Sequence, residues 1–372
     1  MLSHVLPASL LSLSYVVIAS AAPFKFTGNP LGVNFTAPSQ QQLADIQKQA
    51  HGSQPDGPPP PNINPNTLTS LRLIAFNELF EVAFFSLLLS NISTNTTGYT
   101  LSSSYSRDTA VASLTAILAQ EELHVLNANG ALSNFKTSPI QPCQYQFPTT
   151  TYEGAIELAS TFTDLVMGTL QDVSFLLGTD GDSALIRTIT SVVGQEGEQN
   201  GFFRTTNKKI PSALPFLSGS VREFAFSALN QNFVVSGSCD GPNLATIDLP
   251  IYPPLGLVTQ NITAKEQMLK FRLDFSNRAG AQGKTMKDQP GMQYKSLTMV
   301  YMNQQNLPVV QKIQNLALTS EGLTFESMFP YKQGGFGNGL TIAVLTKEGG
   351  NLTSVEGVAT STVFGPALIE IG

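Results

Sequence analysis

Two short motifs in the N-terminal half of the chain have the residue types and spacing of metal ligands. Glu121 and His124 stand three residues apart, and Glu196 and Gln199 repeat the same register further along the chain. Residues three apart share one face of a helix, and apolar residues continue that face on both sides of each motif. Glu122 is expected at the edge of this face. Because carboxylate oxygen and imidazole nitrogen suit iron or manganese, the motifs predict a possible metal site in a helical core.

A third acidic motif lies in a segment that is apolar on nearly every side. Residues 68–89 are typical of a buried central helix, and Glu78 and Glu81 stand three residues apart within it. A buried, unpaired carboxylate costs several kcal/mol, so such groups share protons and hydrogen bonds or they ligate a metal. A Glu on one helix beside a Glu-x-x-His motif on the next helix is half of a di-iron carboxylate site.

Each motif also has an interpretation that needs no metal. Glu121 and His124 suit a buried hydrogen bond that fixes a bundle of helices. Glu78 and Glu81 suit a polar pair that satisfies a neighbouring helix or lies at an edge. Gln199 suits a core amide bonded to one of the acids. The sequence leaves both interpretations open.

Histidine is scarce, which limits the number of metal ions. A complete di-iron site of this kind uses four carboxylates and two His, whereas His51 and His124 are the only His residues after position 4. His51 precedes a Pro-rich run and is expected to be solvated. Gln199, a poorer ligand, stands where the second His would be. We therefore expect one metal ion, or none.

Other chemistries find little support in the sequence. The Gly-rich stretch 333–339 has no Lys-Ser/Thr and does not open a helix, which predicts a loop rather than a phosphate site. No nucleophile elbow or His-Glu-x-x-His motif stands in a suitable setting. The 20 Lys and Arg against 26 Asp and Glu give no basic surface for nucleic acid. No residue is assigned a catalytic role, and the sequence favours a protein that is not an enzyme.

Four helices are predicted to carry the motifs, and the apolar faces of all four are broad enough for a bundle. Their approximate ranges are 68–89, 108–126, 153–177 and 183–203, the second ending at Asn129 and Gly130. The third helix offers Glu153, Glu157 and Asp164, but none lies on its main apolar stripe.

After residue 210 the pattern changes to period two, which is typical of antiparallel strands. Residues 269–275 alternate between apolar and charged, and four further runs look like strands: 232–236, 297–302, 323–329 and 340–345. We therefore expect a β-sandwich in this half. The predicted organisation is a signal peptide (1–21), an extended Pro-rich arm (22–65), a helical bundle (66–205) and a β-rich domain (206–372).

Several features indicate export. An apolar stretch over 5–18 precedes the small-x-small site Ala19-Ser20-Ala21. The two cysteines, Cys143 and Cys239, most simply form one disulfide in an oxidising compartment. Charged residues make up only 12% of the chain, so glycans and neutral polar side chains are expected on its surface. Five glycosylation sequons are present, at Asn34, Asn91, Asn95, Asn261 and Asn351. We expect a secreted glycoprotein, soluble or lodged in the cell wall, with no membrane anchor.

The string from Asn77 to Phe85, together with the two later motifs, resembles the ferritin-like domain of secreted fungal proteins. That group covers stress-response and late sexual-development proteins, with plant desiccation-related proteins as more distant relatives. The resemblance covers roughly residues 66–205. It implies an α+β multidomain chain in which a ferritin-like four-helix bundle precedes the β-sandwich-like domain. The metal ligands that it implies are Glu78, Glu121, His124 and Glu196, with Glu81 and Gln199 nearby.

Three functions follow as hypotheses. The first is a stress-response or developmental glycoprotein, not an enzyme, with a degenerate carboxylate metal site. The second is an iron- or manganese-dependent oxidase or an iron-handling protein. The third is a module that binds cell-wall polymer or another protein through the β-rich domain. The sequence leaves the partner open, and a homodimer is one possibility.

Overall fold

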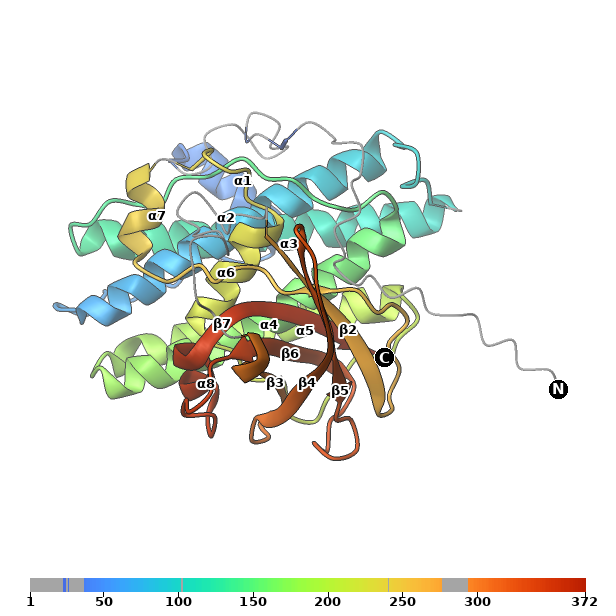
Figure 1. Ribbon diagram of the computed structural model, residues 1–372. Coiled ribbons are helices and arrows are strands. Elements are labelled where there is room, and N and C mark those ends of the chain that lie inside the picture. Colours follow the sequence, from blue (N-terminus) through green and yellow to red (C-terminus); the bar gives the residue numbers. More distant parts are fainter. Residues whose placement is uncertain (1–22, 25, 27–36, 102, 240, 276–293) are drawn as a thin grey trace.

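The computed structural model describes residues 23, 24, 26, 37–101, 103–239, 241–275 and 294–372. The predicted signal peptide and the sequon at Asn34 lie outside the described residues. Figure 1 shows two layers, with long helices packed side by side above a strongly curved β-sheet. The fold is therefore α+β, with helices first and strands last along the chain.

The four predicted bundle helices are all present. They are α2 (Pro65–Ser93), α3 (Ser104–Asn134), α4 (Tyr152–Thr179) and α5 (Ile186–Thr206). Helix α2 packs along α3, and α4 packs along α5. Polar side chains cap the first three helices, since Asn64, Ser103 and Thr151 each accept a hydrogen bond from a backbone N–H of the first turn.

Helix α3 does not end at Asn129 and Gly130, as the sequence suggested. The Asn129 side chain donates to the Ile140 carbonyl and accepts from the Ile140 N–H, at 3.1 and 2.8 Å. This residue therefore anchors the chain that returns after the helix, and the helix continues to Asn134. An Asn whose side chain makes long-range hydrogen bonds therefore need not mark the end of a helix.

Helix α2 is buried on nearly all sides, as predicted. By length and composition it could span a membrane, but 89% of its most apolar window is buried inside the protein. Aromatic rings surround it: the Phe80 ring lies 5.0 Å from Phe162 and 4.8 Å from Phe233, centroid to centroid. Contacts of this kind add to the burial of apolar area, so α2 forms the centre of the bundle.

The predicted extended arm is wrong over residues 40–50, which form helix α1 (Gln40–Ala50). A capping box starts the helix, because Ser39 and Gln42 each bond the other's backbone N–H. Its buried residues Ile46 and Ala50 pack against α3. Because this short helix has few apolar residues, the capping box is the sequence feature that could have predicted it.

The β-rich domain follows two short helices, α6 (Arg222–Asn232) and α7 (Gly241–Ile247). Its strands are β1 (Gly256–Leu257), β2 (Gln267–Asp274), β3 (Thr298–Asn303), β4 (Val309–Leu318), β5 (Gly322–Phe329), β6 (Gly339–Thr346) and β7 (Thr362–Ile371), with α8 (Val355–Ser361) before β7. In the described part of the chain these strands form one antiparallel sheet, in the order β1-β2-β5-β4-β3-β6-β7. The edge strands β1 and β7 contact each other, so the sheet is nearly closed around an apolar core.

Sequence patterns found some of these elements and missed others. The predicted strand at 232–236 is wrong, since α6 ends there and Val234 makes only an isolated bridge to Tyr145. Strand β4 was missed because much of it is exposed and lacks clean apolar alternation. Strand β7 was missed because Gly365 and Pro366 interrupt its apolar run.

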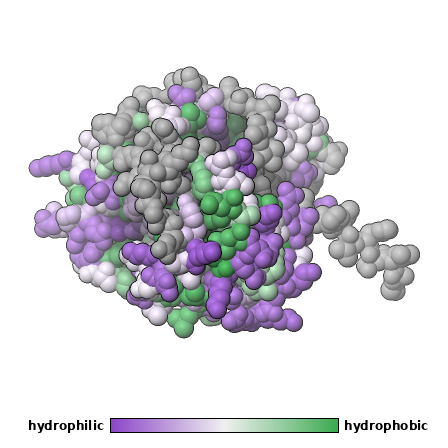
Figure 2. Space-filling view, viewed as in Figure 1, coloured by the Kyte–Doolittle hydropathy of each residue, from purple (hydrophilic) through white to green (hydrophobic). Residues whose placement is uncertain are grey.

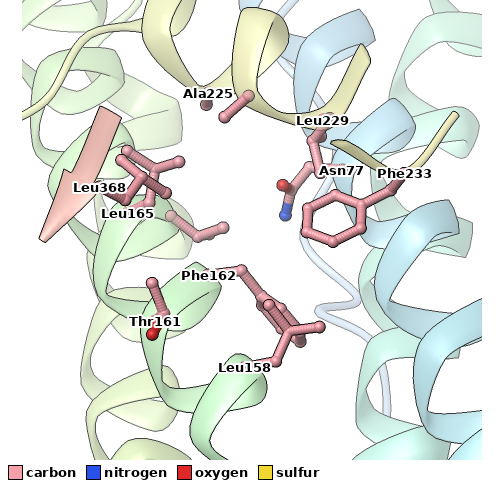
Figure 3. Close-up of a pocket in the computed structure, with 11 residues that line it drawn as sticks. Asn77, Leu158, Thr161, Phe162, Leu165, Ala225, Leu229, Phe233 and Leu368 are labelled. Carbon is pink, nitrogen blue, oxygen red and sulfur yellow. The ribbon is translucent and has the colours of Figure 1, made fainter. Parts of the chain in front are cut away.

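The two layers meet through apolar side chains from both. Leu165 of α4 belongs to the same buried cluster as Phe224 of α6 and Val300 of β3. Figure 3 shows a small cavity at this junction, where Leu165 of α4, Ala225 and Leu229 of α6 and Leu368 of β7 lie around the same space. The cavity measures about 10 Å³, so the junction is closely packed.

The predicted disulfide is confirmed: Cys143 is bonded to Cys239. It joins the segment after α3 to the segment between α6 and α7. The bridge closes a loop with a sequence separation of 96 residues. It therefore ties the bundle to the chain that leads into the β-rich domain.

A substitution in α2 tests the importance of its aromatic contacts. Phe80→Ala should lower the free energy of unfolding by about 3–5 kcal/mol, because a fully buried ring leaves a cavity. Phe175→Ala is the control, since that ring is 61% exposed; its effect should stay within about 0.5 kcal/mol. Thermal and denaturant unfolding measure both. Equal losses for the two variants would contradict this account of α2.

Candidate metal centre

Four of the predicted ligands meet in the centre of the bundle. Glu78 comes from α2, Glu121 and His124 come from α3, and Glu196 comes from α5. Each offers one ligand atom, and these atoms all lie within 4.8 Å of one another. We call these four residues the carboxylate–histidine cluster. Helical spacing thus brought together side chains that are more than 100 residues apart in the chain.

The imidazole of His124 lies between two carboxylates. Its Nδ1 is 2.9 Å from Oε2 of Glu121 and 3.3 Å from Oε2 of Glu78. Gln199 donates from Nε2 to the other oxygen of Glu121, at 2.6 Å. Glu121 is therefore satisfied on both oxygens, and Gln199 serves as the predicted core amide.

The remaining carboxylate oxygens are less well satisfied. Glu196 is fully buried, and neither of its side-chain oxygens has a hydrogen-bond partner among the described residues. Glu81 is also fully buried; Asn77 donates to its Oε1 at 3.2 Å, while its Oε2 has no such partner within the same residues. Buried polar atoms without partners are rare in native structures and call for a ligand, an ion or a proton. The donor set of hard oxygens and one imidazole fits iron or manganese.

Burial and mutual repulsion change the protonation of the acids. Burial raises the pKa of Glu78 to about 7, although the nearby His124 acts in the opposite direction. For Glu81 and Glu196, burial and the charges of the neighbouring carboxylates raise the pKa well above its ordinary value. Without a metal, burial and repulsion therefore favour the protonated form of these groups.

Glu121 and His124 behave as an ion pair. Burial alone would raise the pKa of Glu121, but the charge of His124 and the hydrogen bonds from His124 and Gln199 outweigh it and lower the pKa. Burial would lower the pKa of His124, but the charges of Glu121 and Glu78 raise it well above its ordinary value. The proton on Nδ1 thus supplies the positive charge among these acids.

Amide side chains connect this site to the N-terminal helix, which the sequence did not predict. Gln120 accepts at Oε1 from Nε2 of Gln195, at 2.9 Å, and from Nε2 of Gln199, at 3.3 Å. Its own Nε2 donates to the Ala50 carbonyl at the end of α1, at 3.4 Å. The sequence feature that could have predicted this connection is the Gln residue before each Glu motif, Gln120 and Gln195.

Other predicted positions lie elsewhere. Glu122 was expected at the edge of the core but is fully buried. His51 is exposed, as predicted. In the part of the chain that the structure describes, α4 gives the cluster no acid: Glu157 pairs with Lys209 at 3.4 Å, and Asp164 accepts from Asn200 at 2.9 Å. The Gly-rich stretch 333–339 forms a loop between β5 and β6, as predicted, and its last residue begins β6.

The raised pKa of Glu78 predicts how the metal-free protein responds to pH. Folded Glu78 holds its proton more tightly than an unfolded Glu does, so its stabilising effect is complete below pH 4.5 and is lost as the pH rises to about 7. In a chelator, the temperature of thermal unfolding should therefore fall over this range. Glu78→Gln should flatten the fall, whereas the exposed control Glu198→Gln should not. Identical pH profiles for the two variants would contradict the assignment of this pH dependence to Glu78.

Comparison with known proteins agrees with this geometry. The model of the ferritin-like domain family matches residues 71–209. The matched range contains the whole carboxylate–histidine cluster and nearly all of the four bundle helices. No curated protein matches the chain. The chain therefore contains a ferritin-like helical domain, followed by a β-rich domain with a nearly closed antiparallel sheet.

Proposed function

We propose that this protein binds one iron or manganese ion through Glu78, Glu121, His124 and Glu196. The observation that carries the proposal is Glu196, a fully buried carboxylate with no hydrogen-bond partner among the described residues, within 4.8 Å of three other candidate ligands. A purely structural network would be expected to satisfy such a group. A divalent cation would neutralise the acids and bind their free oxygens.

The site suits one ion better than two. Gln199 stands where a second His would be, and its amide is engaged with Glu121. Helix α4 supplies no acid to the cluster within the described residues. Ion binding would replace the proton on Nδ1 of His124 and the protons on the buried carboxyls, so affinity should rise with pH.

Bound iron or manganese would supply one-electron redox chemistry. The protein side chains would hold the ion and exclude bulk water, because the three Glu ligands are buried and the His124 side chain is only 16% exposed. We therefore favour a metal-holding role over an oxidase. An oxidase is the second candidate, supported by the partial exposure of His124, which leaves one edge of the cluster near solvent.

Metal analysis tests the proposal. Protein purified without chelators, or reconstituted with Fe(II) or Mn(II), should contain about one ion per chain by plasma mass spectrometry. Glu196→Gln should reduce the content at least about tenfold, because it removes a charged ligand. The control Glu198→Gln changes an exposed acid on the same helix and should keep the ion.

Absence of iron and manganese from the unchanged protein after reconstitution would contradict metal binding. The cluster would then be a proton-sharing polar network, which the contact of His124 with Glu121 and Glu78 already supports.

We further propose that the protein is a secreted glycoprotein with a role in stress response or development, like the fungal group that it resembles. The disulfide between Cys143 and Cys239 supports an oxidising compartment. Three of the described sequon residues are exposed: Asn95, Asn261 and Asn351. At the third, Thr353 donates from both its N–H and its hydroxyl to the Asn351 side chain, so the sequon is ordered at the surface.

Expression through a eukaryotic secretory pathway tests glycosylation. The mass of the secreted protein should exceed that of the polypeptide and should fall after treatment with an endoglycosidase. Asn351→Gln should remove the mass of one glycan, and the control Asn315→Gln, at an exposed Asn outside any sequon, should remove none. A secreted protein with no excess mass would contradict the proposal.

The β-rich domain offers a surface for a partner, which supports the third hypothesis in its general form. Figure 2 shows an apolar area among hydrophilic side chains on one face of the molecule. Several large apolar side chains on neighbouring strands are exposed, including Val310 and Leu318 of β4 and Met328 of β5. Their exposure is compatible with binding to cell-wall polymer or protein.

A further inference from the structure

A second group of buried charges lies where the β-rich domain meets the bundle. Arg204 of α5 is only 2% exposed, and its Nη1 lies 3.4 Å from Oε1 of Glu370, a buried residue of β7. Nε of Arg204 donates to the Ile210 carbonyl at 2.8 Å. Asp164 of α4 is buried as well and acts on Glu370 through its charge. One charged contact therefore joins the last strand to the helices.

Two more charged groups complete the set. Lys209, just after α5, lies 3.4 Å from Glu157 of α4 through its Nζ and the Glu Oε1. We call Glu157, Asp164, Arg204, Lys209 and Glu370 the junction cluster. It contains two cations and three acids, so full ionisation would leave one uncompensated negative charge in a buried place. Such a charge is costly, and binding one proton removes it.

Two oxygens show where that proton would be held. Asp164 accepts from Asn200 at Oδ1, but its Oδ2 has no hydrogen-bond partner in the part of the chain described. Oε1 of Glu370 faces Arg204, and its Oε2 likewise has no partner there. The unsatisfied oxygens thus belong to two acids on opposite sides of the junction.

The course of β7 explains why Glu370 points at the helices. Side chains alternate along a strand, so Leu368 and Glu370 share one face. Figure 3 shows Leu368 at the cavity between α4 and α6, whereas Ile369 and Ile371 belong to the core of the β-rich domain. Glu370 therefore lies on the side of β7 that packs against the bundle.

We propose that the junction cluster is a proton-binding site that holds the β-rich domain on the bundle. One proton held by Asp164 or Glu370 balances the charges, and its loss leaves one uncompensated negative charge that loosens the contact of β7 with α5. The proposal does not depend on metal binding, since neither acid belongs to the carboxylate–histidine cluster.

The pKa values of the two acids support this assignment. Burial raises the pKa of Asp164 to about 6, against the lowering effects of Arg204, Asn200 and Lys209. Burial also raises the pKa of Glu370 well above its ordinary value. The charges of Asp164 and Glu157 add to this effect, while those of Lys209 and Arg204 oppose it. Burial therefore favours the protonated form of both acids.

The sign of the pH effect follows from these raised values. The folded protein binds the proton more tightly than the unfolded chain, so the stabilisation is complete below the ordinary pKa of Glu. It is lost as the pH rises towards the folded pKa of Glu370. For one proton, the unfolding equilibrium constant rises by at most about tenfold per pH unit.

Comparison of the full-length chain with its Glu370→Gln variant tests the proposal. Gln keeps the shape but does not ionise, so the variant should unfold at the same temperature as the unchanged protein near pH 4 and at a higher temperature at pH 8. Hydrogen exchange at pH 8 should be slower in the variant for peptides covering 204–210 and 366–371. Effects of the carboxylate–histidine cluster cancel, because both proteins contain it.

Two further variants complete the experiment. Asp164→Asn should act in the same direction as Glu370→Gln, and it supplies the test if the latter fails to fold. Glu348→Gln changes an exposed acid of the β-rich domain and should follow the unchanged protein at every pH. A difference between Glu370→Gln and the unchanged protein that does not vary with pH would overturn the proposal. Unchanged exchange at the junction would overturn it as well.

Discussion

Acids buried in an apolar helical bundle are the constraint on which the rest of this structure depends. Helix α2 buries Glu78 and Glu81 in the bundle, and most of its other buried residues are apolar side chains that offer no hydrogen bonds. Burying such groups is costly unless a cation, a proton or a donor compensates them. The neighbouring helices supply His124 and Gln199, and the structure otherwise relies on protons or a metal ion.

Elements outside the bundle helices keep this centre closed and fixed. The end of α1 accepts a hydrogen bond from Gln120, which in turn accepts from Gln195 and Gln199. Arg222 of α6 donates to Asn66 and Ser70 of α2, so the helix that carries Glu78 is held at its start. The N-terminal segment and the link to the β-rich domain thus both hold the helices that carry the site.

The sequence predicted most of the site, because helical spacing alone decides which side chains share a face. Glu121, His124 and Glu196 followed from that rule, and so did the role of Gln199. The same rule misplaced Glu122, since a single helix does not show how many neighbours cover it. Helix α1 and the junction cluster escaped prediction for a related reason. The α1 signal was a capping box rather than an apolar stripe, and Glu370 meets Arg204 across a sequence separation of 166.

The two halves of the bundle use their polar residues differently, which explains the asymmetry of the metal centre. Helices α2 and α3 direct Glu78, Glu121 and His124 towards the carboxylate–histidine cluster. Between α4 and α5, by contrast, Asp164 and Asn200 bond each other, and Arg204 reaches Glu370 of β7. Helix α4 gives the cluster no ligand in the described chain, and its buried acids Glu157 and Asp164 instead contact Lys209 and Asn200. Helix α4, which gives the metal site no ligand, thus takes part with α5 in the charged junction between the two domains.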